Sequence, residues 1–220
     1  YANSYFTGKA ALRSFWPLWM FLWAALNALF LSGDIFNLYI TLELLGLSAV
    51  ALVALSQTAS ALSAAMRYLL VSLTGSLSYL MGVALVYAAN GTLSLKMLAT
   101  AGPASPSLST AFALMAAGLI MKSALFPMHF WLPPAHANAP APVSAVLSAL
   151  VVKASFFILL RLWLMIFEPA INPSSAQIVG MLGAFAVIWG SQHVNFSRYV
   201  QNNDFYYFTG VDVPNSILII

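Results

Sequence analysis

The sequence predicts an all-α integral membrane protein, a polytopic helical bundle of about six transmembrane helices. Hydrophobic residues make up 62% of the 220 positions and charged residues only 6%, which is too few charges to cover the surface of a soluble domain. Several apolar runs reach the roughly 20 residues that a helix needs to cross a bilayer. These runs lack the strict alternation of barrel strands, so each is expected to be a helix.

The expected spans follow one another closely, and a very short turn separates the first two. They are Arg13–Gly33, Asp34–Ser56, Arg67–Ala89, Ser107–Phe126, Pro142–Phe167 and Ser174–His193. We therefore predict a single transmembrane bundle over residues 1–196. Residues 197–220 form a tail that matches nothing in the pattern before it.

The third expected span is rich in small residues, which let neighbouring helices approach closely. They are Ser72, Gly75, Ser76, Ser78, Gly82 and Ala84. We interpret this texture as helix packing without chemistry.

A proline-rich segment at residues 127–141 interrupts the helical pattern. Pro127, Pro133 and Pro134 are the main breaking residues, since proline lacks an amide hydrogen and also restricts the residue before it. Backbone that leaves the helix inside a membrane must line a polar cavity or pack inside protein. The segment is therefore predicted to be broken or re-entrant.

Three charged residues lie deep in the expected spans and are the main functional candidates. Glu43 is about nine residues into the second span, roughly 13 Å from its start, and Lys122 and Lys153 lie in the fourth and fifth. A charge at a helix centre costs about 2.5 to 3.5 kcal/mol, so such residues mark function by default. Burial disfavours the charged forms and an opposite charge nearby favours them, which is the balance that a proton relay needs. The alternatives are a protonated glutamate that only packs and lysines that extend to the interface.

Two histidines in the broken segment, His129 and His136, are further candidates for the relay because histidine titrates near neutral pH. Metal binding is not expected, since their spacing crosses prolines and no cysteine or nearby carboxylate completes a ligand set. Asp34 is the first residue of the second expected span, where an acidic residue complements the helix dipole, so a capping role is expected. Arg161 is expected to anchor the far interface.

Composition also excludes several kinds of protein. The basic residues are scattered singly, so nucleic acid is not an expected partner. The absence of cysteine removes sulfur-ligated redox cofactors, and no cofactor is predicted. We find neither a nucleophile with a base nor a metal motif, so no active site of its own is expected.

Three ordered motifs resemble one family of membrane proteins. The sequence runs GDIFNLYITLE from Gly33 to Glu43, MKSALFPMH from Met121 to His129, and WLPPAHANAP from Trp131 to Pro140, followed by PVS and then Lys153. This pattern is similar to the antiporter-like subunits of respiratory complex I, of Mrp-type cation/proton antiporters and of membrane-bound hydrogenases. The likeness covers the central part of such a subunit.

The resemblance implies a proton-translocating subunit in the inner membrane of a bacterial or archaeal cell. Glu43 would pair with Lys122 on a broken helix, and Lys153 would continue the polar line. Partners would be the lipid bilayer and other membrane subunits of a complex that is redox-driven, such as an NADH:quinone oxidoreductase or a hydrogenase. The alternatives are an Mrp-type sodium/proton antiporter subunit, with sodium as a second transported ion, and a truncated structural subunit without transport.

Overall fold

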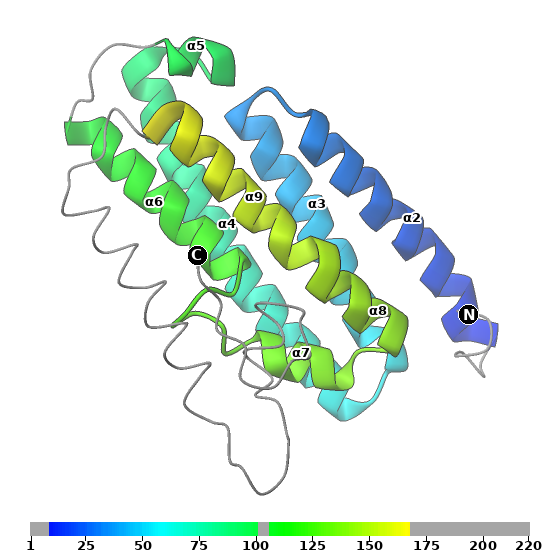
Figure 1. The fold of residues 1–220 in the computed structure, drawn as a ribbon. Helices are drawn as coiled ribbons and strands as arrows, with labels where there is room; N and C mark the ends of the chain where they lie inside the picture. Colours follow the sequence, from blue (N-terminus) through cyan, green and yellow to red (C-terminus); the bar gives the residue numbers. More distant parts are fainter. Residues whose placement is uncertain (1–8, 101–105, 168–220) are drawn as a thin grey trace, which may run out of the picture.

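The computed structural model describes residues 9–100 and 106–167, and the described part of the chain is a helical bundle (Figure 1). Its elements are α2 (Lys9–Leu31), α3 (Ile35–Val53), η1 (Ala54–Ser56), α4 (Ala59–Asn90), α5 (Leu95–Ala99), α6 (Pro106–Lys122), α7 (Leu132–Asn138), α8 (Ala141–Val146), η2 (Leu147–Val151), α9 (Val152–Leu162) and η3 (Trp163–Phe167). The predicted fold class is confirmed.

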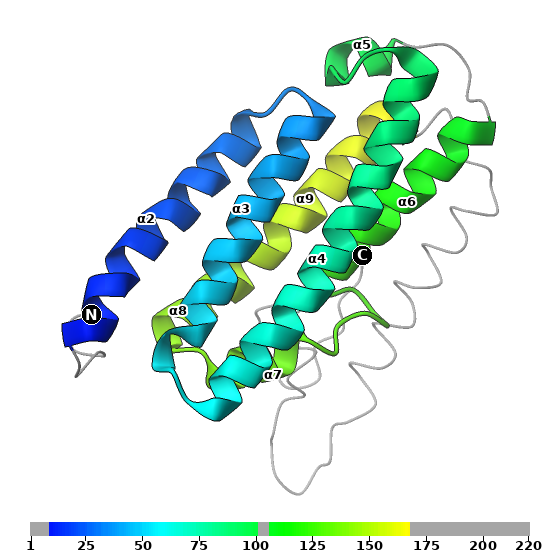
Figure 2. The same cartoon turned by 180° about the vertical axis from the view of Figure 1, so that it is seen from behind.

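The long helices form a row, and one further helix packs against a face of that row, running in about the same direction as the others (Figures 1 and 2). α2 packs on α3, α3 on α4, and α4 on α6. α9 lies against one face of this row, between α3 and α6, as the views from both sides agree (Figures 1 and 2). α4 therefore lies between α3 and α6 and packs on both.

Four of the described helices are long and apolar enough to cross a membrane: Leu12–Leu31, Ile35–Ser56, Ala59–Asn90 and Ala141–Phe167. They correspond to the first, second, third and fifth expected spans. The fourth expected span is a shorter apolar helix, Ser107–Lys122. The sixth, Ser174–His193, lies outside the described residues, as do the end of the predicted bundle at 196 and the tail at 197–220.

Two predicted helix boundaries were wrong. The third span begins at Ala59 rather than at Arg67, because the hydroxyl of Thr58 caps it by accepting from the backbone N–H of Ala61 at 3.2 Å. Serine and threonine are favoured at this position since they satisfy an N–H that has no helical partner. The fourth span ends at Lys122 rather than at Phe126.

The break after α6 is held by one buried tryptophan. Ala124, just after the helix, has a positive φ of 51°, a conformation that ends helices. The indole Nε1 of Trp131 donates to the carbonyl of Met121 at 3.1 Å, and the ring stacks on Tyr68 of α4 with centroids 4.3 Å apart. The same carbonyl accepts from the backbone N–H of Ala124 at 3.2 Å, so the indole adds a second donor at the end of α6.

The three prolines of the break lie in two kinds of position, one in the turns and two at the start of a helix. Pro127 lies in the turns between α6 and α7, whereas Pro133 and Pro134 lie in the first turn of α7. Proline is tolerated there because its missing N–H would have no intrahelical partner. The predicted break is confirmed, and two of its three prolines open the helix that follows.

Asp34 has the capping role predicted for it. One carboxylate oxygen accepts from the backbone N–H groups of Phe36 and Asn37 at 2.8 and 3.0 Å. Arg161 binds the same end of the bundle, where its Nη1 donates to the carbonyl of Ser32 at 2.9 Å. These bonds hold the turn between α2 and α3 and define where α3, the helix that carries Glu43, begins.

Replacing Asp34 with alanine should lower the free energy of unfolding by about 1 kcal/mol, because two backbone N–H groups lose their acceptor. Thermal unfolding of the detergent-solubilised protein measures the change. The matched control is Asp34→Asn, which keeps an oxygen acceptor and should lose less. Equal losses in the two variants would contradict the capping role.

Candidate functional site: a buried charge pair

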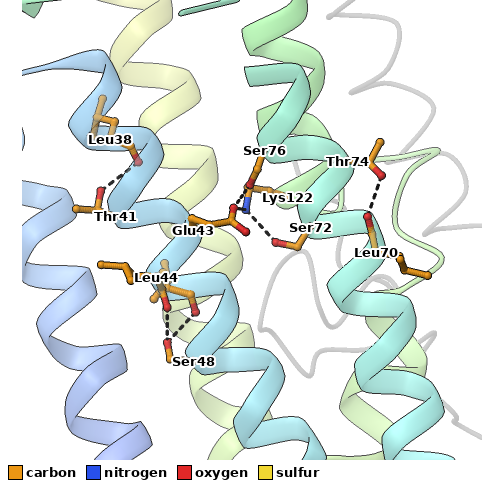
Figure 3. A network of polar contacts seen from close by, with 11 residues as sticks. Leu38, Thr41, Glu43, Leu44, Ser48, Leu70, Ser72, Thr74, Ser76 and Lys122 are labelled. Atoms are coloured by element: carbon orange, nitrogen blue, oxygen red, sulfur yellow. Dashed lines mark hydrogen bonds and ion pairs between the residues drawn. The ribbon is translucent and has the colours of Figure 1, made fainter. Parts of the chain in front are cut away.

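The charged side chains of Glu43 and Lys122 meet inside the bundle (Figure 3). Nζ of Lys122 lies 3.6 Å from Oε2 of Glu43, and the two side chains are 6% (Lys122) and 19% (Glu43) exposed. Glu43 comes from the middle of α3, and Lys122 is the last residue of α6 before the break. Because α6 stops there, the lysine reaches the pair from a helix end that lies inside the apolar bundle.

Two serines of α4, the helix between α3 and α6, form hydrogen bonds with the pair. Ser72 Oγ accepts from Nζ of Lys122 at 2.9 Å, and Ser76 Oγ donates to Oε2 of Glu43. Residues four apart share one face of a helix, so both hydroxyls point between α3 and α6 (Figure 3). Both serines are buried.

The role of Ser72 and Ser76 was missed from the sequence, where both were assigned to helix packing. The sequence did contain a signal for this role, because the two serines are one helical turn apart in a protein with charged residues in its apolar spans. The neighbouring Ser78 fits the packing interpretation, since its Oγ donates to the carbonyl of Leu114 at 2.8 Å and joins α4 to α6.

A glycine on α3 makes room for the lysine. A Cβ at Gly46 would lie 2.9 Å from Oγ of Ser72 and 3.6 Å from Nζ of Lys122. Gly46 is three residues after Glu43 and thus on the same face of α3. Any larger residue would crowd the hydrogen bond between Lys122 and Ser72.

Lys153 does not meet the pair in the described part of the chain. Its side chain is exposed, and its Nζ donates to the carbonyl of Ser148 at 2.8 Å. Of the three charges expected to be buried, the structure brings only Glu43 and Lys122 together within the described residues. Lys153 lies on α9, whose buried residues are Ala154, Ser155, Ile158, Leu159 and Leu162.

The two histidines bind to groups of the broken segment and of the helix that follows it. His129 stacks on Phe126 with ring centroids 5.8 Å apart. His136 is buried, and its Nδ1 lies 2.7 Å from Oγ of Ser144 on α8. Among the residues that the structure describes, no group of three or more histidine, cysteine or acidic residues gathers in metal-binding range.

These features define a class of protein. It is a polytopic α-helical membrane protein in which a partly buried carboxylate and a buried ammonium lie beside a helix break, each bonded to a serine hydroxyl of its own. Such groups are costly in an apolar interior and typical of ion pathways.

Comparisons with known proteins agree with this class. The family model described as NADH:quinone oxidoreductase/Mrp antiporter, TM matches residues 32–198. The chain is 37% identical over 198 residues to NADH-quinone oxidoreductase subunit N of Desulforudis audaxviator (strain MP104C), which covers 87% of this chain and 39% of the relative. It is 29% identical to a subunit of the Na(+)/H(+) antiporter of Alkalihalophilus pseudofirmus (strain ATCC BAA-2126 / JCM 17055 / OF4), over 84% of this chain and 38% of that protein.

A solved structure shares the fold as well. A chain of the membrane-bound sulfane sulfur reductase, an archaeal respiratory membrane complex, superposes with a TM-score of 0.72 at 32% identity, over 80% of this chain and 36% of that one. This protein therefore belongs to the NADH:quinone oxidoreductase/Mrp antiporter transmembrane family. The chain spans less than two fifths of the length of these relatives.

Proposed function

We propose that this chain conducts protons through a membrane complex and that Glu43 and Lys122 form the relay. The observation that carries the proposal is the pair itself, with 3.6 Å between Nζ and Oε2 in a buried site. Desolvation opposes both charges, so each is retained largely because of the other. Protonation of Glu43 removes the opposite charge and favours proton release from Lys122. The charge of one group thus controls the proton on the other.

Lys153, His129 and His136 would extend this relay. Lys153 would receive or pass on protons at a separate point of the pathway, because its Nζ bonds to the carbonyl of Ser148 and does not contact the pair. The histidines lie on the segment that follows Lys122, where they would exchange protons between water and the lysine.

The proposed setting is a multisubunit complex in the cell membrane of a bacterium or archaeon. Two relatives are named as subunits and the similar structure as a respiratory membrane complex. A redox-driven complex is the first proposal, because the subunit N relative is 37% identical. Electron transfer would then occur on partner subunits and would be coupled to proton movement in this chain through the charges of Glu43 and Lys122.

A sodium/proton antiporter is the second candidate, favoured by the similarity to a Na(+)/H(+) antiporter subunit. The driving force separates the two. In vesicles that contain the native assembly, an imposed sodium gradient should move protons only in an antiporter. Electron donors should move them only in a redox-driven complex.

Transport by Glu43→Gln and Lys122→Met variants tests the relay. Both substitutions roughly keep the side chain length but remove the titratable group, so proton movement should fall at least tenfold. The measurement is pH-gradient formation in vesicles at matched amounts of assembled complex. Ser78→Ala, which loses a hydrogen bond between α4 and α6 away from the pair, is the control. Wild-type rates in both variants would leave the chain a structural subunit.

A further inference from the structure

Each charged group of the pair has a hydroxyl of its own. The distance of 3.6 Å from Nζ of Lys122 to Oε2 of Glu43 is longer than a hydrogen bond. The distance of 2.9 Å from the same Nζ to Oγ of Ser72 is a normal one. The carboxylate in turn accepts from Ser76. The lysine is therefore bonded to one serine of α4 and the glutamate to the next.

Hydroxyls are suited to partners whose charge changes. A hydroxyl both donates and accepts, whereas an ammonium only donates and a carboxylate only accepts. Ser72 accepts from charged Lys122 and can donate to its neutral amine. Ser76 donates to charged Glu43 and can accept from its protonated form. Hydrogen bonds would thus persist in both protonation states, without the cost of an unsatisfied polar group in an apolar interior.

We infer that Ser72 and Ser76 are positioning residues of the relay, which hold Lys122 and Glu43 apart and keep each of them hydrogen-bonded in both protonation states. This inference rests on the proposed proton conduction. At 3.6 Å the two charges make no direct hydrogen bond to each other, and each bonds instead to a hydroxyl that can remain its partner when the charge is lost.

Other titratable side chains lie on α4 and on the helices packed against it. Tyr68, one turn before Ser72, stacks its ring on Trp131 and interacts electrostatically with Glu43. Tyr79, on the other side of Ser76, donates to the carbonyl of Ile35. On α9, Lys153 bonds to Ser148 and Arg161 to Ser32. α3 contributes Glu43 itself.

The test is the pH profile of proton transport in vesicles that contain the native assembly. Ser72→Ala removes a hydrogen bond that is stronger to the ammonium than to the neutral amine, so the alkaline limb should move to lower pH by up to about one unit. Ser76→Ala removes one that is stronger to the carboxylate than to the carboxylic acid, so the acidic limb should move to higher pH by a similar amount. Ser72→Thr and Ser76→Thr keep the hydroxyl and should restore the wild-type limbs.

Ser78→Ala serves as the matched control, since it removes a half-buried serine hydroxyl of α4 that bonds Leu114 instead of the pair. Ser72→Cys and Ser76→Cys give a second set, because a thiol is similar in size but bonds weakly; they should move the same limbs as the alanine variants. Profiles equal to that of Ser78→Ala would overturn the inference. If Glu43→Gln and Lys122→Met abolish transport in the same preparation, the proposed relay would still stand. Normal transport in those two variants would instead refute the relay itself.

Discussion

Lys122→Met is expected to destabilise the protein by about 3 kcal/mol, because it leaves the buried carboxylate of Glu43 without its counter-charge. The side chain of Glu43 is only 19% exposed, so water replaces little of the lost interaction. Thermal unfolding of the solubilised assembly measures the loss.

The double variant Glu43→Gln/Lys122→Met separates stability from transport. It removes both charges, so it should be more stable than Lys122→Met and still fail to move protons. This pattern would place the pair in transport and show that the fold does not need it. If the double variant is less stable than either single one, the two residues do not act as a pair.

Gly82→Ala is expected to separate α4 from α6. A Cβ at Gly82 would lie 2.5 Å from the carbonyl of Ala111 and from Cγ of Met115. The helices must therefore move apart, and overpacking of this kind costs about 1 to 3 kcal/mol. The same movement would pull the serines of α4 from Lys122, so proton transport should fall together with the unfolding temperature.

Gly33→Ala is the matched control for this variant, since a Cβ at Gly33 meets nothing within 4 Å. It should behave as wild type in unfolding and in transport. A Gly82→Ala protein with wild-type stability would show that the contact between α4 and α6 is looser than the structure indicates.

Local sequence was enough to locate the break and the charge pair in the chain. The cluster of prolines at 127, 133 and 134 indicated where the helical pattern would be interrupted, since proline lacks an amide hydrogen and restricts the residue before it. Glu43 and Lys122 are conspicuous because charges are rare in apolar runs. The same reasoning overrated Lys153 as a member of the buried group, since depth along a helix does not say which way the side chain points.

Individual contacts required the folded chain. α6 ends at Lys122 instead of Phe126. In its last turn, the carbonyl of Met121 accepts a hydrogen bond from the indole of Trp131. That bond joins residues that no periodicity relates. Ser72 and Ser76 looked like packing residues because their partners lie on two other helices.

The sequence by itself determined that this protein is a helical membrane bundle with a broken segment and a few buried charges. Span length, proline and charge act within a segment, so their consequences follow from local order. The family resemblance already implied that Glu43 pairs with Lys122, but only the tertiary structure decided that serines bond to both, that Gly46 leaves room and that Lys153 is exposed. Helical periodicity establishes which residues share a face, whereas the face that each helix presents to its neighbours depends on packing among all of them.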